Sequence, residues 1–177
     1  RLRAPKGRAV RPSADRVRES VFATLGPLQG ARVLDLFAGS GALGIEALSR
    51  GAADVVFVER AAGPLQSLRG NLAELGLRDH SRVLRSDARS AIRQLGRRGE
   101  CYALILMEPP YSSGEAEKAM VAVVESGILS AEGSLVLESS RRHLPGEVVG
   151  LWRLDERSYG DTVMLRFRNC TGCEGAD

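Results

Sequence analysis

Residues 33–44 read VLDLFAGSGALG and join an apolar strand to a helix through a glycine-rich turn. Glycine suits such a turn because Gly39 and Gly41 can adopt φ > 0 and place no Cβ beside a ligand, while Gly44 lets the helix approach the strand. The stretch therefore predicts a nucleotide-cofactor site. Asp35 precedes the first glycine by four residues, and its carboxylate would repel a pyrophosphate but attract a cationic ligand.

The composition is that of one folded domain. The chain has 177 residues, 44% of them hydrophobic, and a domain of this size buries roughly 70% of its unfolded surface. Apolar runs such as 55–58 and 104–107 are far shorter than the roughly 20 residues that span a bilayer. We expect a cytoplasmic monomer without a membrane segment. Cys170 and Cys173 form a CxxC without a second ligand pair, so no metal site is expected.

The N-terminal twenty residues carry a charge of +5 within a chain whose net charge is +3. Basic arms of this kind neutralise nucleic-acid phosphates, although a run of charge also forms simple solvated faces, and charge alone leaves both readings open. The basic residues are Arg1, Arg3, Lys6, Arg8, Arg11, Arg16 and Arg18, against Asp15 and Glu19.

Strand and helix patterns alternate along the chain. Ser13 is predicted to cap a first helix that ends at Gly26-Pro27. Because the strands are almost wholly apolar, a parallel sheet covered by helices on both faces is expected, followed by a terminal hairpin. The pattern predicts strands near 32–37, 54–59, 81–86, 102–107 and 133–138, helices near 41–50, 62–75, 88–97 and 114–127, and hairpin strands at 148–154 and 162–167.

Acidic residues occur where successive strands end. Asp35 follows the first strand, and Glu59 follows the second, where it would accept hydrogen bonds from ribose hydroxyls. Asp87 follows the third, where it suits an adenine amino group or a helix cap equally well. The fourth strand ends in Glu108 and a Pro-Pro-Tyr turn at 109–111. Carboxylates gathered at one sheet edge repel one another unless hydrogen bonds or a cation compensate them.

The glycines alone leave two cofactors open. Gly39, Gly41 and Gly44 satisfy the GxGxxG pattern of a nicotinamide dinucleotide site, with Glu59 near the place of a ribose ligand. Asp35, the helix before the first strand and the lack of room for a second catalytic domain favour S-adenosylmethionine instead. The carboxylate of Asp35 would bond its cationic amino group, directly or through water.

Three stretches carry a specific resemblance: residues 11–22, residues 34–52 and the Pro-Pro-Tyr turn. Together with Tyr159-Gly160-Asp161-Thr162 they are similar to the RsmD-type family of bacterial 16S rRNA guanine-N2 methyltransferases, over residues 2–168. The resemblance implies a Rossmann-like class I methyltransferase, α/β, with a seven-stranded, mostly parallel sheet and a C-terminal antiparallel hairpin. It places the methyltransferase domain at 13–168, between a basic arm at 1–12, in which the family's β-segment is truncated, and a flexible tail at 169–177.

The resemblance also implies S-adenosylmethionine as methyl donor and a guanine N2 amine of 16S rRNA, free or in the small ribosomal subunit, as acceptor. The implied cofactor residues are Asp35, Phe37, Ala38, Gly39, Gly41, Glu59, Arg60, Asp87 and Ala88. The implied RNA-binding residues are Lys6, Arg8, Arg11, Arg16 and Arg18.

The implied catalytic motif is Glu108, Pro109, Pro110 and Tyr111. The family's motif opens with Asp or Asn, so Glu108 is the main departure. In the family picture this side chain and the first proline's carbonyl accept hydrogen bonds from the base amine, and the tyrosine stacks on the base. Glu108 is then a retuned acceptor, a mark of weakened activity or a change of substrate, and the alternative function is a non-catalytic or retargeted cofactor-binding RNA-binding module.

Overall fold

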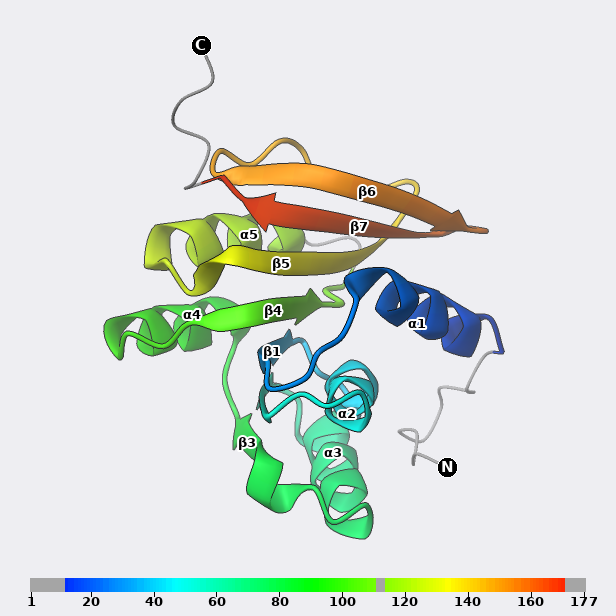
Figure 1. Cartoon of the computed structure of the whole chain (residues 1–177), viewed down its shortest axis with the longest axis vertical. Coiled ribbons are helices and arrows are strands. Elements are labelled where there is room, and N and C mark those ends of the chain that lie inside the picture. The colour runs from blue at the N-terminus through cyan, green and yellow to red at the C-terminus, as the bar shows by residue number, and fades with distance from the viewer. Residues whose placement is uncertain (1–11, 111–113, 171–177) are drawn as a thin grey trace.

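The structure is a computed structural model that describes residues 12–110 and 114–170, with side chains from Arg18 onward (Figure 1). Strands and helices alternate as the sequence predicts. The strands are β1 (Arg32–Leu36), β2 (Asp54–Val58), β3 (Ser81–Leu84), β4 (Tyr102–Met107), β5 (Leu129–Ser140), β6 (Leu151–Tyr159) and β7 (Thr162–Asn169). The helices are α1 (Pro12–Leu25), α2 (Ala42–Ser49), α3 (Ala62–Glu74), α4 (Ala88–Arg97) and α5 (Glu115–Ser126), with a short 3-10 turn, η1 (Arg78–His80).

The seven strands form one sheet in the order β3-β2-β1-β4-β5-β7-β6. Strands β1 to β5 are parallel, and β7 runs antiparallel between β5 and β6. This confirms the expected parallel sheet with a terminal hairpin. The strand order reverses between β1 and β4, and in open α/β sheets ligands bind at such a switch point, outside the carboxyl ends of the strands.

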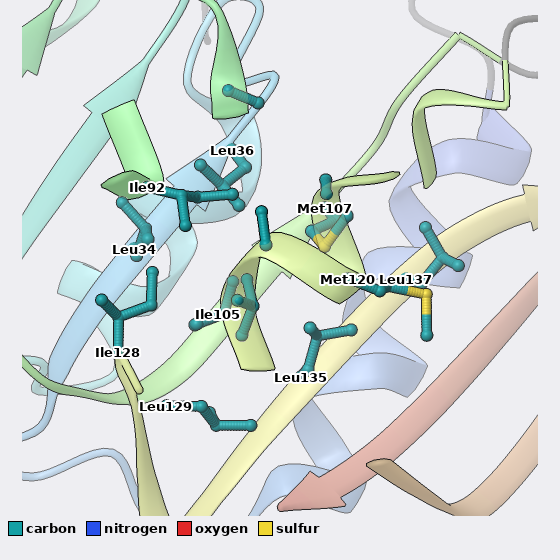
Figure 2. Close-up of a cluster of buried hydrophobic side chains, with 14 of the residues drawn as sticks. Leu34, Leu36, Ile92, Ile105, Met107, Met120, Ile128, Leu129, Leu135 and Leu137 are labelled. Atoms are coloured by element: carbon teal, nitrogen blue, oxygen red, sulfur yellow. The ribbon is translucent and has the colours of Figure 1, made fainter. Parts of the chain in front are cut away.

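Both faces of the sheet are buried, which explains why its central strands are apolar without alternation. Leu34 and Leu36 of β1 point toward α4 and α5, into the hydrophobic cluster that Figure 2 shows. Val33 points to the other face, where it packs with residues of α1, α2 and α3. None of the helices within the described ranges is long and apolar enough to cross a membrane.

Helix α1 is attached to the C-terminal hairpin as well as to the core. Val21 and Phe22 are buried, the Ser20 hydroxyl is hydrogen-bonded to the Tyr159 hydroxyl, and Arg166 Nη1 donates to the carbonyl of Thr24 at 2.9 Å. These contacts hold the helix against the same sheet as the glycine turn.

The start of α1 differs from the prediction. The helix begins at Pro12, so Ser13 lies inside it and is not the residue before it. Proline is favoured at the first helical position because its φ is already helical and its missing N–H has no helical partner to lose.

The first strand of the hairpin is also displaced from its predicted bounds of 148–154. Strand β6 continues to Tyr159 because the polar stretch Asp155-Glu156-Arg157 lies on an exposed edge strand, where the backbone pairs with β7 and the side chains face water. The predicted turn is confirmed: Gly160 adopts φ 63° between the two strands.

The edge of the sheet opposite the carboxyl ends holds an ionic cluster. Glu100 Oε2 accepts hydrogen bonds from Arg82 Nη2 at 2.5 Å, the Tyr102 hydroxyl at 2.9 Å and Arg32 Nη2 at 3.3 Å. Burial opposes the ionisation of Glu100, but the bonds from Arg82 and Tyr102 outweigh it and hold its pKa below the usual range. The cluster ties the starts of β1, β3 and β4 together.

Candidate active site

The turn after β1 has an unusual backbone. Phe37, Gly39 and Gly41 all adopt left-handed φ, at 62°, 57° and 86°, a conformation that costs a bulky residue such as Phe37 more than glycine. The Ala38 N–H donates to the carbonyl of Val58 at 2.9 Å, so the turn is anchored to the neighbouring strand. Backbone strain of this kind persists where the surroundings fix it, and here it shapes the edge of the sheet above β1.

Two glycines are required by packing. A Cβ on Gly44 would lie 2.3 Å from Phe57 Cε1 and 2.9 Å from Asp35 Oδ2, which confirms the predicted close approach of helix and strand. A Cβ on Gly41 would lie 2.4 Å from Leu68 Cδ1. The missing side chain of Gly41 therefore makes room for Leu68 of α3.

Asp35 is a buried acid at this turn, 1% exposed. Its Oδ2 accepts a hydrogen bond from the Gly44 N–H at 2.9 Å. Burial raises the pKa of Asp35 to about 8, and the nearby carboxylates of Glu108 and Glu59 add to the rise, which the Gly44 bond only partly offsets. Among the described residues no cation balances the charge of this side chain, and a ligand with a positively charged amino group fits this requirement.

Glu59 joins the glycine turn to α3. Its Oε2 accepts from the Gly39 N–H at 2.9 Å and its Oε1 from the Ala61 N–H at 2.7 Å. A carboxylate has about four acceptor positions, so each oxygen keeps capacity for a hydroxyl group. Arg60, the next residue, is exposed.

Asp87 caps α4 in this structure. Its Oδ1 accepts from the Ser90 N–H at 3.0 Å, and the hydrogen bonds from Ser90 hold the pKa of Asp87 below its usual range. Of the two roles predicted for Asp87, an adenine contact and a helix cap, the structure shows the helix cap. Ala88 packs in the core, so only its backbone is placed to meet a ligand.

A cavity opens beside the Pro-Pro turn. Glu108 is exposed at the end of β4, Pro109 is buried and Pro110 exposed, while Tyr111 lies outside the described residues. The cavity has a volume of about 260 Å³ and combines apolar walls with a carboxylate, a hydroxyl and an imidazole. It is lined by Pro109, Pro110, Gly114, Ala116, Glu117, Ser139, His143 and Leu144.

The far wall of the cavity is a turn that follows β5. Ser139 Oγ donates to the carbonyl of His143 at 2.6 Å, and His143 Nδ1 lies 2.9 Å from Ser140 Oγ. Sequence reasoning missed these residues, because they follow the motif by some thirty positions and only the sheet order brings them to it.

Most of the RNA-binding residues that the resemblance implies lie outside the residues that the structure describes. Lys6, Arg8 and Arg11, and the side chain of Arg16, are outside the described part of the chain. Arg18 Nε lies 4.0 Å from Glu46 Oε2, with its side chain 22% exposed. This ion pair joins α1 to α2.

Asn71 was also missed. It is buried on α3, and its Nδ2 donates to the carbonyl of Ser40 at 3.0 Å. This hydrogen bond holds the glycine turn to α3. The signal was present in the sequence, since Asn71 is a polar residue on the apolar stripe of Leu65, Leu68 and Leu72.

The fold is the Rossmann-like fold of S-adenosylmethionine-dependent methyltransferases. It is defined by a sheet whose strand order reverses between β1 and β4, by the glycine turn after β1 and by the acidic residues at the carboxyl ends of the strands. A family model described as "Conserved hypothetical protein 95" matches residues 1–168. The chain is 39% identical over 169 residues to "Putative rRNA methyltransferase YlbH" of Bacillus subtilis, covering 94% of this chain and 92% of the relative.

It is 34% identical over 180 residues to "Ribosomal RNA small subunit methyltransferase D" of Escherichia coli K12, covering 100% and 89% of the two chains. The solved structure "Putative methyltransferase yhhF" from Escherichia coli superposes with a TM-score of 0.82 at 33% identity, over 95% of this chain and 90% of that one. The chain belongs to the RsmD/YlbH family.

Proposed function

We propose that this protein transfers a methyl group from S-adenosylmethionine to the exocyclic N2 amine of a guanine in 16S rRNA. The observation that carries the proposal is the buried, uncompensated Asp35 beside the glycine turn, at the same sheet edge as Glu108 and the Pro-Pro turn. The choice of small-subunit rRNA is supported by family membership and by the name of the Escherichia coli relative.

The residues present fit the cofactor. Asp35 would bond its amino group, Glu59 its ribose hydroxyls and Asp87 its adenine, with the turn at 37–41 and Arg60 around it. When bound, S-adenosylmethionine supplies a methyl group activated by a positively charged sulfur. The protein therefore has to orient the acceptor more than to activate it, and orientation of this kind is worth about 7–11 kcal/mol.

On the acceptor side, Glu108 and the carbonyl of Pro109 would accept the hydrogen bonds of the N2 amine and aim its lone pair at the methyl carbon. Proline suits this turn because it has no N–H to compete. Bound S-adenosylmethionine would supply the methyl group, and Glu108 or water would accept the proton that the amine loses on methylation. The target base must be unpaired or flipped out, and stacking on Tyr111 would hold it by about 1–3 kcal/mol.

The activity is tested with labelled S-adenosylmethionine and small ribosomal subunits, or 16S rRNA, from cells that lack this methylation. Mass spectrometry of the digested nucleosides should find labelled N2-methylguanosine in the small-subunit RNA. Large subunits treated in parallel should contain no labelled N2-methylguanosine. A methyl group on another atom or RNA would overturn the assigned acceptor. Binding of cofactor and RNA without transfer would identify a non-catalytic RNA-binding module.

Glu108 is tested separately, in single turnover. Since a misplaced acceptor group costs on the order of 10²-fold in rate, Glu108→Ala should slow transfer by about that factor while cofactor affinity changes little. Glu108→Asp shortens the side chain by one methylene and should also slow the step. Equal transfer rates in both variants and the parent would contradict the orienting role of Glu108.

A further inference from the structure

Helix α4 carries a row of arginines that belongs neither to the proposed cofactor site nor to the cavity beside the Pro-Pro turn. Arg89, Arg93 and Arg97 recur every fourth residue, and we call them the arginine stripe. All three are exposed, whereas the opposite side of the helix is buried in the core through Ala88, Ala91, Ile92 and Leu95. Residues 82–98 contain six arginines and one aspartate. The net charge of this short segment, +5, therefore exceeds the net charge of +3 of the whole chain.

The stripe arginines form no ion pair with the described part of the chain. Across the described residues, no carboxylate oxygen comes within 4.0 Å of a stripe guanidinium. Arg89 does interact electrostatically with Asp87, but that carboxylate is held by the Ser90 N–H as the helix cap. Seven other arginines are matched to an acid within that distance, namely Arg18, Arg32, Arg50, Arg82, Arg153, Arg157 and Arg168.

Helix stability does not account for the stripe. A cation in the last turn, such as Arg97, is favoured by the helix dipole, but Arg89 lies in the first turn, where a cation is disfavoured. Helix α5, which packs beside α4 (Figure 1), pairs its Glu115 with its own Lys118 at 3.3 Å. The positive charge of the stripe is therefore left for a partner outside this part of the molecule.

The arginine stripe begins close to the proposed active site. Helix α4 starts directly after β3, at the sheet edge that holds Asp35, Glu59 and Glu108, and the stripe runs from there for about 12 Å along the helix axis. It lies on the face of the sheet opposite α1. Guanidinium groups bind phosphate through two parallel hydrogen bonds.

We propose that the arginine stripe binds the phosphate backbone of the substrate rRNA, on the sheet face opposite α1. This inference rests on the proposed function, since it takes the RNA substrate as given. RNA would then contact the protein on both sides of the carboxyl edge, and the stripe would hold the strand that leads away from the target base.

The test compares two triple variants in the full chain. One replaces the stripe (Arg89→Gln, Arg93→Gln, Arg97→Gln) and the matched control replaces three ion-paired arginines (Arg153→Gln, Arg157→Gln, Arg168→Gln). Affinity for 16S rRNA and for small subunits is measured between 50 and 200 mM salt. Loss of three phosphate contacts should reduce the slope of log K against log salt by about 2, and the control should keep the parent's slope.

Cofactor affinity and thermal unfolding by circular dichroism should be the same in the parent and both variants, which separates loss of RNA contact from loss of fold. A stripe variant with the parent's affinity and slope, in a parent that methylates rRNA, would overturn the inference alone. Weaker binding to particles with unchanged binding to bare rRNA would assign the stripe to a protein partner and overturn it too. A parent that neither binds nor methylates rRNA would overturn the proposed function as well.

Discussion

The replacement Asp35→Asn should change how the stability of the protein depends on pH. Asp35 has a pKa of about 8 in the folded chain, against 3.8 as the ordinary value. Between these two values the folded state holds a proton that the unfolded state has lost, so stability falls as pH rises. Each pH unit inside the window costs about 1 kcal/mol, and the step from pH 5 to pH 7 therefore removes about 2–3 kcal/mol.

Asparagine keeps an oxygen for the Gly44 N–H but has no proton to lose, so this component should vanish in the variant. Urea unfolding at pH 5, 6, 7 and 8 measures it as the difference between parent and variant, which cancels the contribution of all other groups. Asp79→Asn, a change at an exposed residue, should leave the parent's pH dependence intact. If the curves of the parent and Asp35→Asn run parallel across this range, the buried, uncompensated state of Asp35 is wrong.

Gly44→Ala should destabilise the protein by about 1–3 kcal/mol, because the new methyl group would overlap the ring of Phe57 and overfill the core. It should also weaken S-adenosylmethionine binding, since α2 must move away from β1; unfolding in urea and calorimetric titration measure the two effects. Glu100→Ala should cost about 1–3 kcal/mol in the same unfolding assay, because the Tyr102 hydroxyl and two arginines lose their common acceptor.

Each of these changes has a matched control. Gly70→Ala places its methyl group in open space within α3 and should stabilise the protein by about 0.5–1 kcal/mol. Glu132→Ala removes a carboxylate whose side chain is 88% exposed and should change stability by less than about 0.5 kcal/mol. Loss of stability in the controls equal to that in Gly44→Ala and Glu100→Ala would remove the packing and buried-acceptor explanations.

The sequence predicted the parts of the site that belong to a single βα unit. Gly44 could be assigned to close packing because the strand and the helix that it joins are adjacent in the chain. Asp35 could be placed at a strand end for the same reason. The pattern of strands also predicted the terminal hairpin, and the resemblance added the number of strands in the sheet; the structure confirms both.

The parts that were missed depend on contacts between distant segments. The turn at 139–144 reaches the cavity beside the Pro-Pro turn only through the pairing of β4 with β5, and the polar stretch after Leu154 becomes a strand only because β7 supplies its hydrogen bonds. Local propensity could show neither. The packing role of Gly41 could not be predicted either, since nothing in the chain near it reveals that Leu68 of α3 lies beside it.

The order of strands sets an order of assembly. Strand β7 follows β6 in the chain but lies between β5 and β6 in the sheet, so β6 has no neighbouring strand until β7 has been made. The hydroxyl of Tyr159 and the guanidinium of Arg166, which hold α1, arrive at the same late stage. The strands β1 to β4 are therefore made before the segment that fixes α1 in place.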